Sequence, residues 1–195
     1  IFELNKSFGF VIPDDKKFGS DIFISKKHFN GAKNKEKVVV KITKYPEKGK
    51  KAEGKIIEVL GNVDMAGIDM LSLIKEYDLP YEFPEEVLKE ARSIEKTIVK
   101  EELKNRIDLR NKTIFTIDGE DAKDLDDAVC VEKNSSGTYN LIVSIADVSH
   151  YVKEGSNLDK EAILRGTSIY MLGRVIPMLP RELSNGICSL NAGED

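Results

Sequence analysis

Hydrophobic and polar positions in the first sixty residues alternate in short runs that are typical of β-strands. The five runs are Ile1–Leu4, Phe8–Ile12, Asp21–Ser25, Val38–Thr43 and Gly54–Leu60. Turn residues such as Pro13-Asp14-Asp15 and Asn30-Gly31 separate them. No run has a helical period. Five short strands of this kind predict a small barrel of the oligonucleotide-binding (OB) type, because closure removes open sheet edges.

The rest of the chain mixes helical and strand patterns. Asp69–Tyr77 and the segment that opens at Pro84 carry apolar residues at helical spacing, and Ser156–Arg165 has the pattern of a capped helix. Thr113–Ile117 and Ala128–Glu132 are strands by composition. The predicted fold class is therefore α+β, with a barrel first and a mixed domain after it.

The predicted second strand has an aromatic face. Alternation puts Phe8 and Phe10 on the same side, and Phe23 of the next strand can join them. Exposed rings surrounded by lysines, Lys6 and Lys26 among them, make a stacking platform for single-stranded RNA, because every base has a π-face. The alternative is that these phenylalanines fill the barrel core. The set together with its lysines favours the surface.

Charge is divided unevenly along the 195 residues. The first 60 residues hold 14 Lys and 8 acidic residues, a net of +6, whereas the remainder holds 16 basic and 26 acidic residues, a net of −10. A basic module attracts polyanions through counterion release, although a merely soluble lysine-rich surface is the alternative. The acidic excess indicates either a solvated face or metal ligands.

Composition limits the classes of protein further. A hydrophobic content of 41% is ordinary for a folded domain. We see no apolar run of about 18 residues and no secretory pattern, so we expect a cytoplasmic protein. Cys130 and Cys188 lack metal-type spacing, and Cys130 is expected to be a buried thiol. The chain opens at Ile1 and stops at Asp195 in a loop-like sequence, so we expect a piece of a longer protein.

Six acidic residues fall within the ten positions 118–127, between the two strands expected in this region. Carboxylates crowded in this way repel one another unless cations lie between them. Oxygen ligands favour hard ions over zinc, and a calcium EF-hand is excluded because Gly119 follows Asp118 directly and the flanks are strands. Paired Mg²⁺ ions that hydrolyse a phosphodiester need several such ligands. A catalytic Mg²⁺ site, a structural cation site and a solvated acidic turn stay open on chemistry alone.

Two groups of motifs resemble known families. Lys6–Val11 and Asp21–Ser25 resemble the paired aromatic motifs of cold-shock domains, with Ser7 and Ser25 in place of the usual glycine and histidine. Four further segments, in this order, resemble the ribonuclease II and ribonuclease R family, with details that favour the ribonuclease R branch. They are Arg106–Arg110, Thr116–Ala128, Ile145–Val152 and Val175–Ser184.

The ribonuclease resemblance implies roles for individual residues. The metal-binding catalytic aspartates of the family match Asp118, Asp124, Asp126 and Asp127. The third of these, Asp126, matches the aspartate whose loss most selectively stops chemistry. Tyr170 matches an aromatic residue that stacks on a base near the cleaved end, and the alternative is a core tyrosine with a bonded hydroxyl.

Three more residues have possible roles that are less defined. Asp147 and His150 sit near a strand end and could support the aspartates, although a single histidine is more often structural. The expected helix at 156–165 would carry Arg165 near the RNA.

The resemblance also implies an organisation and an activity. We expect a cold-shock-like OB domain at 1–61, a helical connector at 62–105 and the N-terminal part of a ribonuclease II-type catalytic domain at 106–195. The parent would be a Mg²⁺-dependent 3′-to-5′ exoribonuclease that degrades single-stranded RNA to nucleoside 5′-monophosphates, with this piece inactive alone. A non-catalytic RNA-binding module with a structural cation loop is the first alternative, and a protein-interaction scaffold is the second. No obligate protein or membrane partner is indicated.

Overall fold

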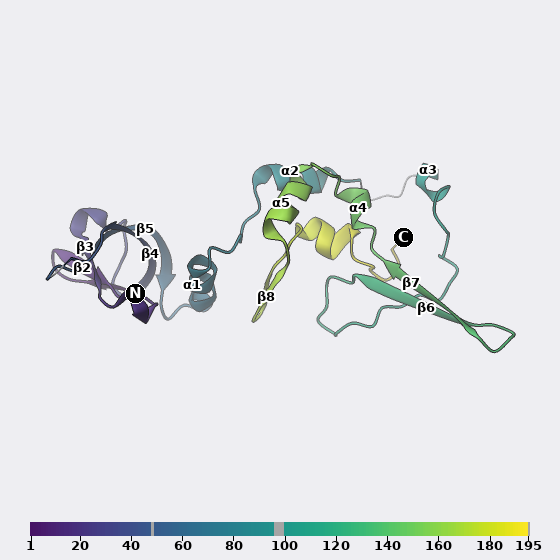
Figure 1. Cartoon of the computed structure of the whole chain (residues 1–195), viewed down its shortest axis with the longest axis horizontal. Helices are drawn as coiled ribbons and strands as arrows, with labels where there is room; N and C mark the ends of the chain where they lie inside the picture. The colour runs from purple at the N-terminus through teal and green to yellow at the C-terminus, as the bar shows by residue number, and fades with distance from the viewer. Residues whose placement is uncertain (48, 96–99, 195) are drawn as a thin grey trace. The chain divides into compact units, whose positions relative to one another are not determined.

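The computed structural model describes residues 1–47, 49–95 and 100–194 and divides the chain into two compact units, Ile1–Leu79 and Pro80–Asp195 (Figure 1). The first unit contains a closed barrel with strand order β1-β2-β3-β5-β4, followed by one helix. Its elements are β1 Phe2–Leu4, β2 Phe8–Val11, η1 Lys16–Phe18, β3 Ile22–Ser25, η2 Lys26–His28, β4 Glu36–Lys44, β5 Glu53–Asn62 and α1 Ile68–Glu76. The expected five-stranded OB-type barrel is confirmed.

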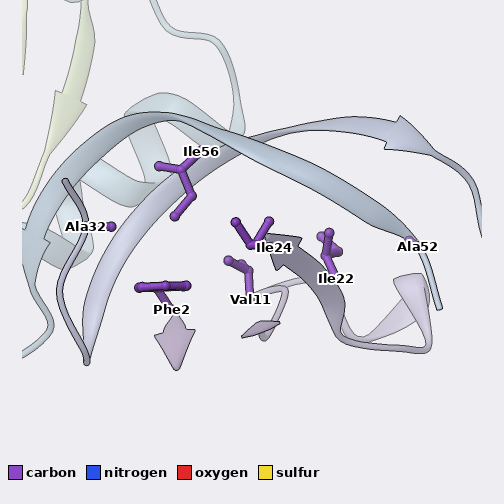
Figure 2. Packing of buried hydrophobic residues seen from close by; sticks show 7 residues of the cluster. All are labelled: Phe2, Val11, Ile22, Ile24, Ala32, Ala52 and Ile56. Carbon is purple, nitrogen blue, oxygen red and sulfur yellow. The ribbon is translucent and has the colours of Figure 1, made fainter. Parts of the chain in front are cut away.

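The barrel is closed around Phe2 and smaller apolar side chains, which Figure 2 shows inside the curved sheet. These residues are Phe2, Val11, Ile22, Ile24, Ala32, Ala52 and Ile56. Strand β3 pairs antiparallel with β2 and parallel with β5, which brings a distant part of the sequence beside β3. Burial of this cluster is the main favourable term in folding the barrel.

Gly9 explains why the two phenylalanines of β2 face outward. It lies on the core side of the strand, where a Cβ atom would collide with the ring of Phe2 and approach the backbone carbonyl of Glu3. Only glycine lets β1 and β2 come this close. Because side chains alternate along a strand, Phe8 and Phe10 then lie on the outer face.

Helix α1 completes the first unit by covering β5. Ile68 and Ile74 are buried on its inner side, and a Lys75–Glu58 ion pair of 2.9 Å joins helix and strand on the outside. Gly61 allows the approach, because it has a positive φ of 137° and a Cβ atom there would press on Ile68.

The second unit combines short helices with two hairpins. Its main core holds Val87, Ala91, Leu158, Leu179, Leu183 and Cys188, which join two of the helices to the last segment of the chain. The elements are α2 Glu85–Ser93, α3 Lys100–Leu103, β6 Asp127–Lys133, β7 Tyr139–Ile145, α4 Val148–Tyr151, α5 Asn157–Arg165, β8 Ile169–Met171, β9 Arg174–Ile176 and the irregular turn η3 Leu183–Ile187. The α+β class is confirmed.

One predicted strand is wrong. Residues 113–117 contribute only an isolated bridge in which Phe115 and Val129 exchange backbone hydrogen bonds of 3.1 and 2.9 Å. Strand composition was present, but a strand also needs a neighbour along its length, and the chain leaves β6 after this single pair. The strand expected at 128–132 is confirmed as β6, which pairs with β7.

Helix α5 was predicted correctly from its ends. The Ser156 side chain accepts a hydrogen bond from the Asp159 backbone N–H, and Gly166 ends the helix with a φ of 72°. Arg165, which we expected this helix to carry near RNA, has a side chain that is 1% exposed and hydrogen-bonded inside the second unit, and its position relative to RNA stays a prediction. Across the residues described, no helix has the length and apolar character needed to cross a membrane.

Candidate RNA-binding surface and catalytic loop

Phe8, Phe10 and Phe23 form one cluster, which we call the aromatic platform. Phe10 and Phe23 are directly paired across β2 and β3, and the three ring centroids lie 5.6–6.0 Å apart. The rings are half-buried and none belongs to the barrel core, whose residues alternate with them along the strands. The geometry therefore favours the surface reading over the core reading.

The aromatic platform has a lysine directly beside it. Lys6 and Lys26, which the sequence analysis expected around the platform, are exposed. Lys51, which sequence reasoning missed, holds its Nζ 4.4 Å from the centroid of the Phe10 ring and 3.1 Å from an oxygen of Asp21. A cation over a ring face is attracted by the π electrons, so Lys51 is kept beside the platform. Its place depends on the parallel pairing of β3 with β5, which no local sequence signal reveals.

The acidic loop, residues 118–127, leads into β6. Three of the four predicted aspartates are exposed, whereas Asp124 is half-buried. Burial is the first cause of a raised pKa at Asp126, and repulsion by nearby carboxylates is the second. Those carboxylates are, in order of effect, Asp124, Asp127 and Asp118. The structure thus brings the negative charges of all four within range of one another.

The donor chemistry of this loop fits a hard cation. All four candidate ligands are carboxylates, and a divalent ion relieves the repulsion that raises the pKa of Asp126. Over the described ranges, no three acidic, cysteine or histidine side chains meet closely enough to hold a metal ion between them. The four aspartates therefore lie close enough for their charges to interact, but their side chains do not converge on one point as the ligands of a bound metal ion do.

Tyr170 is hydrogen-bonded to the acidic loop. Its hydroxyl donates a 2.8 Å hydrogen bond to Oδ2 of Asp124, and this bond is the first cause of a raised pKa at Tyr170. The residue is 67% exposed on β8, so it is not a core tyrosine. Its ring is therefore accessible beside Asp124. The hydrogen bond joins residues that are 46 positions apart in the sequence.

Asp147 and His150 have partners outside the four aspartates. Asp147 accepts a 2.8 Å bond from Arg106, which is the first cause of its lowered pKa, and His150 Nε2 lies 2.9 Å from a Glu102 oxygen. Both contacts tie the segment before the acidic loop to α4. These groups therefore have structural partners of their own.

Backbone hydrogen bonds fix the acidic loop from two directions. The Ala146 N–H, at the end of β7, donates to the carbonyl of Asp126 at 3.1 Å. Leu125 is bound through both its N–H and its carbonyl to Ser189 and Leu190, near the end of the chain. Sequence reasoning missed these contacts because they involve backbone groups, which every residue supplies.

Comparison with known proteins gives two family matches and several relatives. Residues 10–84 match the cold shock domain model, and residues 106–195 match the RNB domain model. Ribonuclease R of Thermotoga maritima is 54% identical, covering 100% of this chain and 28% of the relative. Ribonuclease R of Escherichia coli is 44% identical, covering 96% and 23%. The chain thus spans about a quarter of the length of these curated relatives.

A solved structure matches the fold of nearly the whole chain. RNase R of Mycoplasma genitalium, in complex with double-stranded RNA, superposes with a TM-score of 0.86 at 30% identity, covering 97% of this chain and 34% of that one. The same protein with ribose methylated single-stranded RNA gives the same TM-score.

Proposed function

Because this chain belongs to the ribonuclease R family along its whole length, we propose that it is part of a magnesium-dependent 3′-to-5′ exoribonuclease. Its substrate is single-stranded RNA and its products are nucleoside 5′-monophosphates. The observation that carries the proposal is the placement of four aspartates in one loop, with Asp124 bonded to the exposed Tyr170, within the segment that matches the RNB domain. The proposal includes a cytoplasmic location, as expected in the sequence analysis.

In this proposal the barrel holds RNA. The aromatic platform offers ring faces for bases, and the lysines around it neutralise phosphates without reading sequence. The relative with known structure has been solved with bound RNA, which supports an RNA-binding role here. The barrel therefore contributes affinity rather than chemistry.

The acidic loop carries the chemistry. Asp118, Asp124, Asp126 and Asp127 are the residues that would hold Mg²⁺, which supplies positive charge against the scissile phosphate and activates water. Tyr170 holds Asp124 through its hydroxyl and presents an exposed ring on which the terminal base can stack. We propose that this chain alone has little nuclease activity, because about three quarters of the relatives' length lies outside it.

The test is Asp126→Asn in the whole enzyme, with Asp121→Asn as a matched control in the same loop. Asparagine keeps the shape and one carbonyl oxygen but removes a negative charge that the cation needs. We expect single-turnover cleavage to fall by about 10²–10³-fold, as for other lost electrostatic contacts in active sites, with RNA affinity unchanged. The control variant should cleave like wild type.

The alternative, an RNA-binding module with a structural cation loop, predicts another pattern. Asp126→Asn would then lower the unfolding temperature and leave cleavage proportional to the folded fraction. That result would overturn the catalytic proposal, and so would equal losses in both variants.

A further inference from the structure

Ser189 occupies an unusual position in the second unit. Among the described residues, only Ser189 and Arg165 are polar or charged and also buried, and Ser189 is 6% exposed. It follows Cys188, which packs in the core with Leu183. A hydroxyl in such a place costs free energy unless it is hydrogen-bonded, so its partners have to be accounted for.

Two of the partners of the Ser189 hydroxyl lie in the acidic loop, more than sixty positions earlier. Oγ accepts a 3.0 Å bond from the Leu125 N–H, and it donates toward the Lys123 carbonyl at 3.3 Å. The Asn191 side-chain oxygen is a second acceptor at 3.4 Å. One hydroxyl thus holds the backbone on both sides of Asp124.

A backbone bond extends this connection. The Leu190 N–H donates to the Leu125 carbonyl at 2.9 Å, so both polar backbone groups of Leu125 are bound to residues 189–190. Leu125 separates Asp124 from Asp126 in the sequence. Fixing its peptide groups therefore fixes the backbone from which these two carboxylates project.

From this arrangement we propose that Ser189 is a positioning residue, which holds Asp124 and Asp126 in the relative placement from which they take a divalent cation. The inference rests on the proposed function of the acidic loop. Crowded carboxylates push one another apart, and a loop without regular secondary structure resists that push only through specific hydrogen bonds. Those to Ser189 and Leu190 act between Asp124 and Asp126, and the bond from Ala146 acts at Asp126. The serine connects the loop to the packed core through Cys188, and this connection keeps the ligands preorganised.

The experiment compares Ser189→Ala with Ser184→Ala in the whole enzyme. Ser184 is a half-buried serine nearby whose hydroxyl bonds to Asn185 instead of the loop, so it controls for the loss of a serine. Ser189→Cys keeps the volume but hydrogen-bonds weakly, and it replaces the alanine variant if that variant fails to fold. The readouts are hydrogen exchange of the Leu125 amide, calorimetric titration with Mn²⁺, and cleavage as a function of Mg²⁺ concentration.

For Ser189→Ala we expect the Leu125 amide to exchange up to about tenfold faster, as the loss of one hydrogen bond implies. Mn²⁺ affinity should fall about 10–100-fold, the usual effect of losing a group that orients a metal ligand. Raising Mg²⁺ should restore cleavage. Ser184→Ala should match wild type in all three readouts.

Two results would overturn the inference while leaving the proposed function intact. One is wild-type Mn²⁺ affinity in the Ser189 variant. The other is a loss of Mn²⁺ affinity that comes with faster exchange over the whole second unit instead of at Leu125, which is the pattern of a merely structural serine. In contrast, a wild-type enzyme that neither binds Mn²⁺ nor cleaves RNA would overturn the proposed function itself.

Discussion

Arg165 offers a sharp test of how the second unit is held together. Its guanidinium donates to the backbone carbonyls of Pro80, Glu82 and Pro177 at 2.6, 2.8 and 3.3 Å, and to Glu161 at 2.8 Å. It also lies 3.5 Å from the centroid of the Phe83 ring. One side chain therefore joins α5 to the segment before α2 and to the segment after β9.

The expected cost of Arg165→Ala follows from what the substitution leaves behind. Removing one partner of a buried pair costs about 3–5 kcal/mol, because the remaining charge has lost its compensation. Here three carbonyls also lose a donor, and each buried unsatisfied group costs about 1–3 kcal/mol. These terms are not additive, so we expect about 3–5 kcal/mol, a large part of the roughly 5–15 kcal/mol typical of a domain.

Two further substitutions separate the contributions. Arg165→Lys keeps the charge, but a single ammonium cannot reach carbonyls arranged around a planar fork, so it should recover only part of the loss. Glu161→Gln removes the acidic partner and leaves all three carbonyl contacts in place. We expect Glu161→Gln to cost less than Arg165→Ala, because the guanidinium keeps its three carbonyl acceptors, whereas Arg165→Ala leaves those carbonyls and Glu161 without a donor.

The assay is urea unfolding followed by far-ultraviolet circular dichroism, with hydrogen exchange read separately for the two units. Peptides from residues 80–195 should lose protection in Arg165→Ala, whereas peptides from the barrel should not change. A loss below about 1 kcal/mol, within the range of an exposed ion pair, would refute the reasoning. Equal effects of Arg165→Ala and Glu161→Gln would show that the ion pair, rather than the carbonyl contacts, is responsible.

The remaining predictions concern RNA binding and the thiols. Replacing Phe10 and Phe23 by alanine should weaken binding of single-stranded RNA by about 1–3 kcal/mol per stacked base, as measured by fluorescence anisotropy, with the circular dichroism of the barrel unchanged; unfolding of the variant would contradict this. In Lys51→Ala, the slope of log affinity against log salt concentration should become shallower by the amount that one lysine–phosphate contact contributes on a single strand, roughly 0.7. An unchanged slope would mean that Lys51 touches no phosphate. Burial raises the pKa of Cys188 to about 11. At pH 8 only on the order of one thiol in a thousand is then ionised, so iodoacetamide should label native protein slowly and unfolded protein fast.

The sequence patterns correctly predicted those features that depend only on residues close together in the chain. The cap at Ser156 and the stop at Gly166 bound α5 in the sequence as they do in the structure, because capping involves only neighbouring residues. The aromatic platform followed from strand alternation in the same way. The strand expected at 113–117 failed because pairing depends on a distant partner, and Phe115 found only one.

The supports of the candidate site could not be predicted, because they join positions far apart. Lys51 reaches Phe10 through a parallel pairing, and Tyr170 reaches Asp124 across 46 positions. A resemblance to a known family gave Tyr170 a role without giving it a hydrogen-bond partner. The acidic loop, in contrast, was recognisable because six acidic residues fall within ten positions, and the family resemblance then singled out the four candidate aspartates.

Arg165 and Ser189 show a second reason why the supports are hard to predict. Both are buried polar side chains, and most of their partners are backbone groups of Pro80, Glu82, Lys123 and Leu125. Nearly every residue supplies a backbone N–H and a carbonyl, so the backbone side of such a contact leaves no mark in the sequence. A change of the Lys123 or Leu125 side chain would therefore keep these hydrogen bonds, and only a change of the side-chain partner, the arginine or the serine, can reveal what they contribute.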